Sequence, residues 1–375
     1  MPLRARASVN LAAVGRNVAR MAQAAPSARI CAVVKADAYG HGMVPVARAA
    51  LSAGASWLGV ATAAEAAGLR AAGIDHVPVL VLGVLSDEEL PIALAARADV
   101  VAWRESFVAR VAALGGGRIH VKLDTGMGRL GTRDAGEATR VALAADAGEG
   151  TRLAGLLTHF ATADERGDAF FGEQLARFNA WAGPLRARFP DAVLHAANSA
   201  ATLRDPASHF DLVRPGVALY GMDPFGADPA ACGLDPALEL HSYLGEVKPC
   251  APGESAGYGR RFVAAAPTRI ATVPVGYGDG WRRGLTNDAD VLVGGRRFPL
   301  VGTVSMDNIT LDLGPQADGP GVGEDAVLIG RQGSERILAE EVARRLGTIN
   351  YEVTCGLSGR VPREYHHDGA PVAGA

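Results

Sequence analysis

Residues 30–62 read ICAVVKADAYGHGMVPVARAALSAGASWLGVAT, and this stretch decides how the first half of the chain is expected to fold. Its two ends, ICAVVKAD and WLGVAT, are short runs rich in β-branched and other apolar residues, as in buried strands. Between them, MVPVARAALSAG places apolar residues three and four positions apart, which predicts a helix. A strand, a helix and a second strand in succession predict two parallel strands joined by a helical crossover.

The same alternation continues to about residue 221. Eight alternations of strand and helix predict a parallel sheet, and eight is the number that closes into a (β/α)8 barrel of the TIM type. An open, doubly wound sheet is the main alternative. The barrel is favoured because polar candidates lie near the carboxyl ends of the predicted strands, where barrel enzymes build their sites; these are Lys35, Asp124, His159, Ser199 and Arg214. The predicted strands cover residues 30–37, 57–62, 77–83, 99–103, 118–125, 153–160, 193–199 and 211–221.

The pattern of apolar residues changes after about residue 238. Alternating apolar runs separated by turn residues replace the helical pattern, with one helix expected near ILAEEVARRLG (337–347). We therefore expect a barrel over residues 9–237. We also expect a smaller, mainly β second domain over residues 238–375, joined by residues 1–8. The final stretch HHDGAPVAGA (366–375) is predicted to be a loose tail.

Composition excludes several classes of protein. Hydrophobic residues make up 49% of the 375 residues, and the net charge of -3 comes with no basic run, so nucleic acid is not an expected partner. No apolar stretch is long enough to span a membrane, and MPLRARASVN lacks the apolar core of a signal peptide, so a cytoplasmic location is expected. The four cysteines show no C-x-x-C spacing, so neither a disulfide framework nor a metal site is expected.

Lysine is scarce in this chain. Of 37 basic residues, only Lys35, Lys122 and Lys248 are lysines. Codon bias explains the general preference for arginine, but a lysine that survives such bias is enriched at positions where arginine cannot replace it. An amine can lose its proton and condense with an aldehyde, which a guanidinium cannot do. Lys35 and Lys122 are therefore candidate functional residues.

Residues 120–131, HVKLDTGMGRLG, contain a G-x-G-x-x-G pattern. A dinucleotide-binding loop would follow the first strand of its unit and precede a second strand ending in an acidic residue, and this context is missing. Strand alternation instead places Lys122 and Asp124 on one face, so Lys122 either pairs with Asp124 in a structural role or points into the barrel neutral or modified. The glycine-rich turn could return Arg129 over the strand end.

Nine motifs resemble the bacterial alanine racemase family, in the order in which that family has them, over nearly the whole chain. They are AVVKADAYGHG (32–42), HVKLDTGMGRLG (120–131), LLTHFATAD (156–164), ANSAA (197–201), LVRPGVALYG (212–221), AGYGRRF (256–262), VGYGDGWRR (275–283), GTVSMDN (302–308) and INYEVTCGLSGRVPR (349–363). Several are long and specific, so chance does not explain them.

The resemblance implies pyridoxal 5′-phosphate as cofactor and a two-base mechanism that interconverts L-alanine and D-alanine. Lys35 would bind the cofactor aldehyde and handle the proton on one face of the substrate, and Tyr258 would act on the other face. His159 would be the partner of Tyr258, and Arg214 would face the pyridine nitrogen. The resemblance also implies that Lys122 is an N6-carboxylysine, carbamylated by CO₂, which orients Arg129. The remaining implied cofactor contacts are Tyr39, Ser199, Gly216, Val217 and Tyr351, and the implied substrate contacts are Arg129, Tyr277 and Met306.

The family also implies a homodimer with shared active sites, in which the second domain completes the partner's barrel site. D-alanine made in this way would supply peptidoglycan synthesis. Three alternatives remain open: a racemase that also accepts serine, a pyridoxal-phosphate carrier, and an amino-acid decarboxylase with the same barrel.

Overall fold

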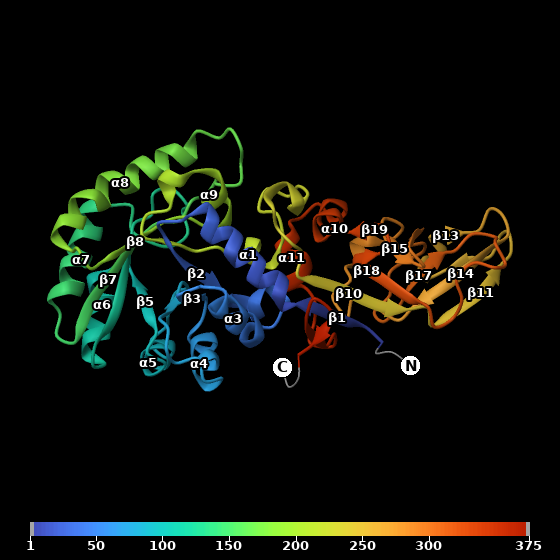
Figure 1. The fold of residues 1–375 in the computed structure, drawn as a ribbon, viewed down its shortest axis with the longest axis horizontal. Helices are drawn as coiled ribbons and strands as arrows, with labels where there is room; N and C mark the ends of the chain where they lie inside the picture. Colours follow the sequence, from blue (N-terminus) through green and yellow to red (C-terminus); the bar gives the residue numbers. More distant parts are fainter. Residues whose placement is uncertain (1–3, 373–375) are drawn as a thin grey trace.

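The computed structural model describes residues 4–372, which form a barrel at one end and a β-rich domain at the other (Figure 1). The barrel sheet has eight parallel strands in the order β8-β7-β6-β5-β4-β3-β2-β9. Backbone hydrogen bonds from the Asp211 N–H to the Leu194 carbonyl (3.0 Å) and from the Arg214 N–H to the Ala197 carbonyl (2.8 Å) join the two ends of this order, β8 and β9, and so close the barrel. The expected (β/α)8 barrel is confirmed. Its strands are β2 (Arg29–Val33), β3 (Trp57–Val60), β4 (Val79–Val81), β5 (Asp99–Ala102), β6 (Gly117–Lys122), β7 (Thr151–Leu157), β8 (Val193–His195) and β9 (Leu212–Val213).

Helices surround the barrel, and the first of them comes before the first barrel strand in the sequence instead of after the last one. Helix α1 (Leu11–Ala24) precedes the first barrel strand and contacts α3 and the 3-10 turn η2 (Val217–Tyr220), so it occupies the position of the missing helix after β9. The other helical segments are α2 (Lys35–Gly40), α3 (Met43–Ser52), α4 (Ala63–Ala71), α5 (Glu89–Ala95), α6 (Glu105–Ala113), α7 (Ala135–Ala147), α8 (Phe170–Arg188) and α9 (Ser199–Arg204). No helix within residues 4–372 has the length and apolarity of a membrane span.

The second domain is built on a sheet in which both ends of the chain take part. Strand β1 (Arg6–Asn10) pairs with β10 (Leu238–Tyr243) on one side and with β20 (Arg363–His367) on the other. The prediction of a loose tail was therefore wrong for residues 366–371, because residues 366 and 367 belong to β20 and residues 370 and 371 form β21, which pairs with β20; residues 373–375 lie outside the described residues. The division of the chain at residue 237 stays a prediction.

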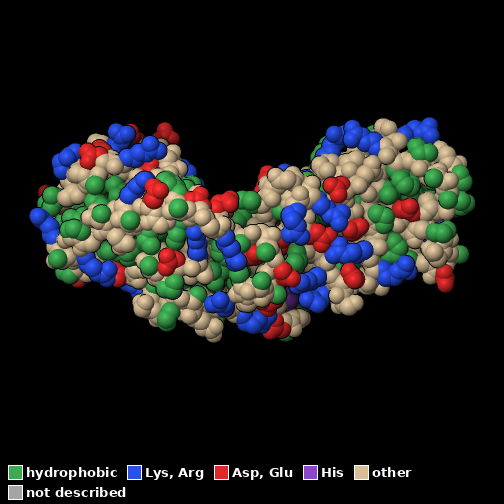
Figure 2. Space-filling view, turned by 90° about the horizontal axis from the view of Figure 1, so that it is seen from above, with side chains coloured by type: hydrophobic (Ala, Val, Ile, Leu, Met, Phe, Trp, Pro, Cys, Tyr) green, Lys and Arg blue, Asp and Glu red, His purple; other side chains and the backbone are tan. Residues whose placement is uncertain are grey.

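The remaining elements complete this mainly β lobe, which Figure 2 shows as a second mass joined to the barrel by a narrower middle. They are β11 (Glu246–Cys250), β12 (Ser255–Ala256), β13 (Phe262–Val263), β14 (Thr268–Val273), β15 (Asp290–Val293), β16 (Arg296–Pro299), β17 (Ile309–Asp312), β18 (Asp325–Gln332), β19 (Glu335–Ile337), β21 (Ala370–Pro371), α10 (Ala339–Leu346) and α11 (Asn350–Cys355). Helix α10 falls where a helix was expected.

The predicted barrel strands extend further than the observed ones at their carboxyl ends. The clearest case is the last strand, expected over residues 211–221 but limited to Leu212–Val213. Pro215 cannot donate a ladder hydrogen bond, and the chain then enters the turn η2. Residues just beyond the strand ends are thus released from the sheet and can line a site.

Candidate active site

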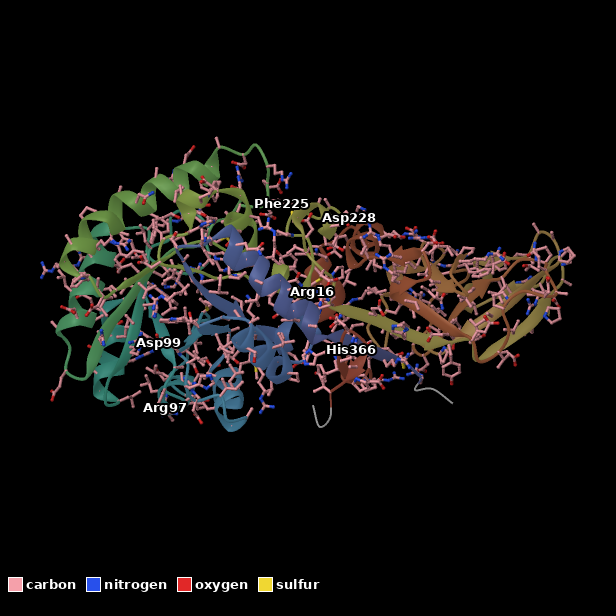
Figure 3. All side chains as sticks on the ribbon, in the orientation of Figure 1. Arg16, Arg97, Asp99, Phe225, Asp228 and His366 are labelled. Carbon is pink, nitrogen blue, oxygen red and sulfur yellow. The ribbon has the colours of Figure 1, made fainter. Side chains whose placement is uncertain are left out.

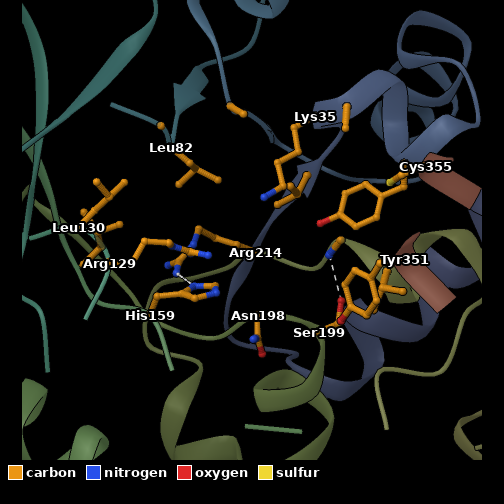
Figure 4. Close-up of a pocket in the computed structure, with 18 of the residues that line it drawn as sticks. Lys35, Leu82, Arg129, Leu130, His159, Asn198, Ser199, Arg214, Tyr351 and Cys355 are labelled. Atoms are coloured by element: carbon orange, nitrogen blue, oxygen red, sulfur yellow. Dashed lines mark hydrogen bonds between the residues drawn. The ribbon is translucent and has the colours of Figure 1, made fainter. Parts of the chain in front are cut away.

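A cavity of about 490 Å³ opens beyond the carboxyl ends of the barrel strands, with a size typical of cofactor sites. Figure 4 shows side chains from distant parts of the sequence converging on it. Ten of the predicted site residues line this cavity, namely Lys35, Tyr39, Lys122, Arg129, His159, Ser199, Arg214, Gly216, Val217 and Tyr351.

Lys35 is followed at once by a left-handed turn. Residues 36–39 have φ between 52° and 54°, a conformation that costs about 1–2 kcal/mol per non-glycine residue. The Glu65 carboxylate accepts hydrogen bonds from the Ala36 and Ala61 N–H groups, both at 2.7 Å, and so fixes the start of this turn to α4. Four such residues in succession are a concentration of backbone strain typical of functional sites. Lys35, just before the turn, and Tyr39, at its end, both line the cavity.

Both lysine amines in the cavity lose their protons more readily than ordinary lysines do. Burial and the neighbouring Arg129 lower the pKa of Lys35. Burial, Arg214 and Arg129 lower the pKa of Lys122 to about 8. Each amine therefore has an enlarged neutral fraction, which is the form that reacts with an aldehyde or with CO₂.

The glycine-rich turn after Lys122 uses Asp124 for its own structure. The Asp124 carboxylate accepts hydrogen bonds from the Gly126 and Gly128 N–H groups, at 3.1 and 3.0 Å, and pairs with Arg133 at 3.3 Å. Although burial opposes ionisation, these hydrogen bonds lower the pKa of Asp124. The structure contains no hydrogen bond between Asp124 and Lys122 within residues 4–372. The turn places Arg129, from the same segment, at the cavity.

Arg214 is buried, at 3% exposure, and makes its hydrogen bonds to uncharged acceptors. It donates to His195 Nδ1 (2.8 Å), His159 Nδ1 (3.2 Å) and the carbonyl oxygens of Thr158 (2.8 Å) and Ala196 (3.0 Å). Burial lowers the pKa of Arg214 to about 10, so the guanidinium stays charged at neutral pH. Burial and the nearby cations lower the pKa of His159 well below its ordinary value, so this imidazole is neutral.

Hydroxyl and N–H groups without protein acceptors gather at another part of the cavity. The Tyr39 and Tyr351 hydroxyls line it, and neither donates a hydrogen bond within residues 4–372. Ser199 Oγ accepts from the Gly216 N–H at 2.9 Å, which leaves its own hydroxyl hydrogen free. The Gly216 N–H is thus already engaged, unlike that of Val217. A Cβ atom on Gly216 would lie 2.4 Å from the Tyr39 hydroxyl oxygen, so a larger residue here would displace the Tyr39 side chain.

Tyr258, Tyr277 and Met306 lie outside this cavity. They are 75%, 42% and 52% exposed, and all three belong to the second domain. Their loops adjoin, since Thr303 Oγ1 donates to the Tyr258 carbonyl (2.6 Å), and the Tyr277 N–H donates to the Ser305 carbonyl (3.0 Å). Two aromatic side chains and a methionine are therefore exposed on adjoining loops, and exposed apolar side chains grouped in this way are typical of an interaction site.

The sequence-based prediction missed several residues of this region. Asn198, Cys355, Leu82 and Leu130 also line the cavity. Asn198, Leu130 and Cys355 fall within motifs quoted above, which could have indicated them, whereas Leu82 shows no signal beyond its place after a strand. His195 and Asp99 also escaped notice, because single polar residues inside apolar strands gave no pattern, and His120, although it begins the motif at residues 120–131, was given no role.

Comparison with known proteins places the whole chain beside one group of enzymes. Residues 9–224 match the family model "Alanine racemase, N-terminal domain" and residues 237–365 match "Alanine racemase, C-terminal domain". The chain is 41% identical over 365 residues to the alanine racemase of Symbiobacterium thermophilum, covering 96% of each protein. It is 44% identical to that of Geobacillus stearothermophilus, covering 95% of this chain and 92% of the relative. The solved structure of the alanine racemase from Streptomyces coelicolor A3(2) superposes with a TM-score of 0.90 at 40% identity, over 97% of this chain and 98% of that one.

Proposed function

This chain belongs to the alanine racemase family, and we propose that its barrel cavity interconverts L-alanine and D-alanine with pyridoxal 5′-phosphate held by Lys35. One observation supports this function above others. A single cavity holds an amine with a lowered pKa, a buried arginine without a carboxylate partner, and a group of unpaired hydroxyl donors.

The residues present fit this cofactor. When bound, pyridoxal phosphate supplies an aldehyde for an amine and a ring that delocalises the negative charge left after the Cα proton is removed. The Tyr39, Ser199 and Tyr351 hydroxyls and the Val217 N–H are free to donate to a phosphate group. Arg214 would face the ring nitrogen, where a guanidinium donates a hydrogen bond but not a proton.

Racemisation requires a proton to leave one face of Cα and another to return on the opposite face. Lys35 would hold or release the proton on one face through its Nζ. The opposite face would belong to Tyr258 of the partner subunit. His159 accepts from Arg214 at Nδ1, so its own hydrogen lies on Nε2 and is free to donate to the phenol oxygen. Such a donor stabilises the anionic form of that phenol, which is the form that can take a proton.

Arg129 would bind the substrate carboxylate, with Lys122 carbamylated beside it. In carbamylation the Lys122 ammonium first releases one proton, and the neutral amine then adds to CO₂, so that an N–C bond forms and a second proton is released; a cation thereby becomes an anion. Without this change Lys122, Arg129 and Arg214 are neighbouring positive groups, and the structure offers Lys122 no carboxylate hydrogen bond within residues 4–372. The exposed Tyr277, with Met306 through its backbone N–H, would complete the substrate contacts of the partner's site.

The exposed positions of Tyr258, Tyr277 and Met306 support a homodimer with shared sites. Mixing a Lys35→Ala chain with a Tyr258→Phe chain tests this arrangement, because each mixed dimer would contain one site with both residues intact. Random reassociation should restore about one quarter of the native rate. No recovery of activity, although mass measurements show mixed dimers, would contradict shared sites.

The function itself is tested by incubating the purified protein with L-alanine and measuring D-alanine by chiral chromatography. Formation of D-alanine at a rate that depends on added pyridoxal phosphate is expected. Release of CO₂ would instead indicate a decarboxylase, and bound cofactor without turnover would indicate a carrier. A cytoplasmic location and a role in supplying D-alanine for peptidoglycan complete the proposal and follow from the family resemblance.

A further inference from the structure

Three polar residues lie in the interior of the barrel, beneath the cavity. Asp99 begins β5, His120 lies within β6 and His195 ends β8. Their exposures are 1%, 0% and 0%. Barrel interiors are normally filled with apolar side chains, and buried polar groups are costly unless they are hydrogen-bonded. The apolar residues packed around them include Trp57, Leu80, Val101, Leu157, Val193 and Leu212.

These residues form one continuous series of hydrogen bonds. Asp99 Oδ2 lies 3.1 Å from His120 Nε2, and His120 Nδ1 lies 2.8 Å from His195 Nε2. His195 Nδ1 lies 2.8 Å from Arg214 Nη1. At the other end, Arg118 Nε donates to Asp99 Oδ1 at 2.9 Å. The series therefore runs from the amino end of the barrel, where Figure 3 labels Asp99, to the cavity at its carboxyl end.

The direction of every hydrogen bond in the series follows from Arg214. An arginine can only donate, so His195 Nδ1 must be an acceptor and the hydrogen of His195 must lie on Nε2. That hydrogen is donated to His120 Nδ1, so the hydrogen of His120 lies on Nε2 and is donated to the Asp99 carboxylate. Burial and Arg214 lower the pKa of His195 well below its ordinary value, in agreement with a neutral ring.

Among residues 4–372, Arg214 has no carboxylate acceptor, and its acceptors are two histidine nitrogens and two backbone carbonyls. Within the described part of the chain, the one carboxylate connected to it by hydrogen bonds is Asp99, through two neutral imidazoles. Each donor in such a series polarises the next, so the negative charge of Asp99 strengthens the acceptor that faces the guanidinium.

We propose that Asp99, His120 and His195 are positioning residues that hold the Arg214 guanidinium charged and correctly oriented from the far end of the barrel. This inference rests on the proposed function, in which Arg214 donates to the ring nitrogen of the cofactor. Because Arg214 also fixes His159 by a hydrogen bond, Asp99 acts on the catalytic groups without touching them.

Two measurements test this relay. The first is ¹⁵N NMR of the histidine side chains in the native protein with cofactor bound, with signals assigned from single His→Gln variants. Both His120 and His195 should be neutral with hydrogen on Nε2. The second compares Asp99→Asn, which keeps an acceptor oxygen but removes the charge, with Val100→Ala, which creates a cavity on the opposite face of the same strand.

We expect Asp99→Asn to lower kcat about ten-fold with little change in the KM for alanine, and to alter the His120 and His195 signals. Val100→Ala should lower the melting temperature without either effect. Hydrogen on Nδ1 of His120 or His195 in the native protein would overturn the relay. An unchanged kcat in Asp99→Asn, or an equal loss in both variants, would also do so. If the native protein racemises nothing, the proposed function fails, while the native histidine signals still decide the relay.

Discussion

Replacing Lys122 with methionine tests whether its amine is carbamylated. The side chain is 5% exposed, and burial, Arg214 and Arg129 lower its pKa from 10.5 to about 8. This difference corresponds to a penalty of about 3 kcal/mol for keeping the unmodified ammonium in the fold. Because the unfolded chain has the higher pKa, the penalty is complete below pH 8 and disappears as the pH rises to 10.5. Methionine keeps the length of the side chain without the charge.

In CO₂-free buffer at pH 7, Lys122→Met should therefore be more stable than the native protein, by up to about 3 kcal/mol. In bicarbonate buffer the native amine becomes an anion that compensates Arg129 and Arg214, and the advantage of methionine should disappear. The assay is calorimetric unfolding at fixed concentrations of protein and cofactor, because both affect the melting temperature. Lys248→Met, at an exposed lysine of β11, is the control and should change nothing. The same stability difference in both buffers, together with a native mass that lacks an added CO₂, would refute the reasoning.

Three further substitutions have defined outcomes. Lys35→Ala should lower the racemisation rate about a thousand-fold or more. Borohydride reduction should attach the cofactor to Lys35 in the native protein and should leave the corresponding peptide of the variant unmodified. An unmodified Lys35 in reduced, coloured native protein would contradict this. Gly216→Ala should weaken cofactor binding about ten-fold, because the added Cβ would lie 2.4 Å from the Tyr39 hydroxyl oxygen, and a fluorescence titration that gives the native Kd would contradict it. Ala36→Gly should keep or raise the melting temperature, because glycine adopts φ of 52° without strain, while kcat falls a few-fold as the turn loosens; a lower melting temperature would count against strain at this position.

The barrel could be predicted because its sequence pattern is local. Each strand and helix of residues 29–221 carries its own periodicity, and the strand ends locate the candidate side chains. The pairing of β20 with β1 could not be predicted, since parallel pairing between opposite ends of a chain leaves no mark on either segment. The left-handed turn at residues 36–39 could not be predicted either, because alanine, unlike glycine or asparagine, does not favour such a backbone.

Site residues could be predicted where they lie in long motifs, and they could not be predicted where a single residue stands without such a motif. Lys35 and Arg214 stand in motifs with distinctive neighbours, and the structure places both on one cavity. Asp99 occurs alone in an apolar strand, His120 begins a motif that gives it no role, and only three-dimensional contacts reveal that the two are linked. Whether Tyr258 reaches a second barrel stays a prediction, because an exposed tyrosine on one chain does not specify what covers it.

The pairing of β1 with both β10 and β20 means that the barrel is inserted into the second domain rather than placed before it. Two covalent connections, one after Asn10 and one before Leu238, therefore join the two lobes, where a simple tandem arrangement would have one. Twisting of one lobe against the other is resisted by backbone as well as by packing. In the proposed homodimer, where the second domain of one chain would complete the barrel site of its partner, two connections would keep the lobes of each chain aligned, and cutting either connection should loosen that alignment.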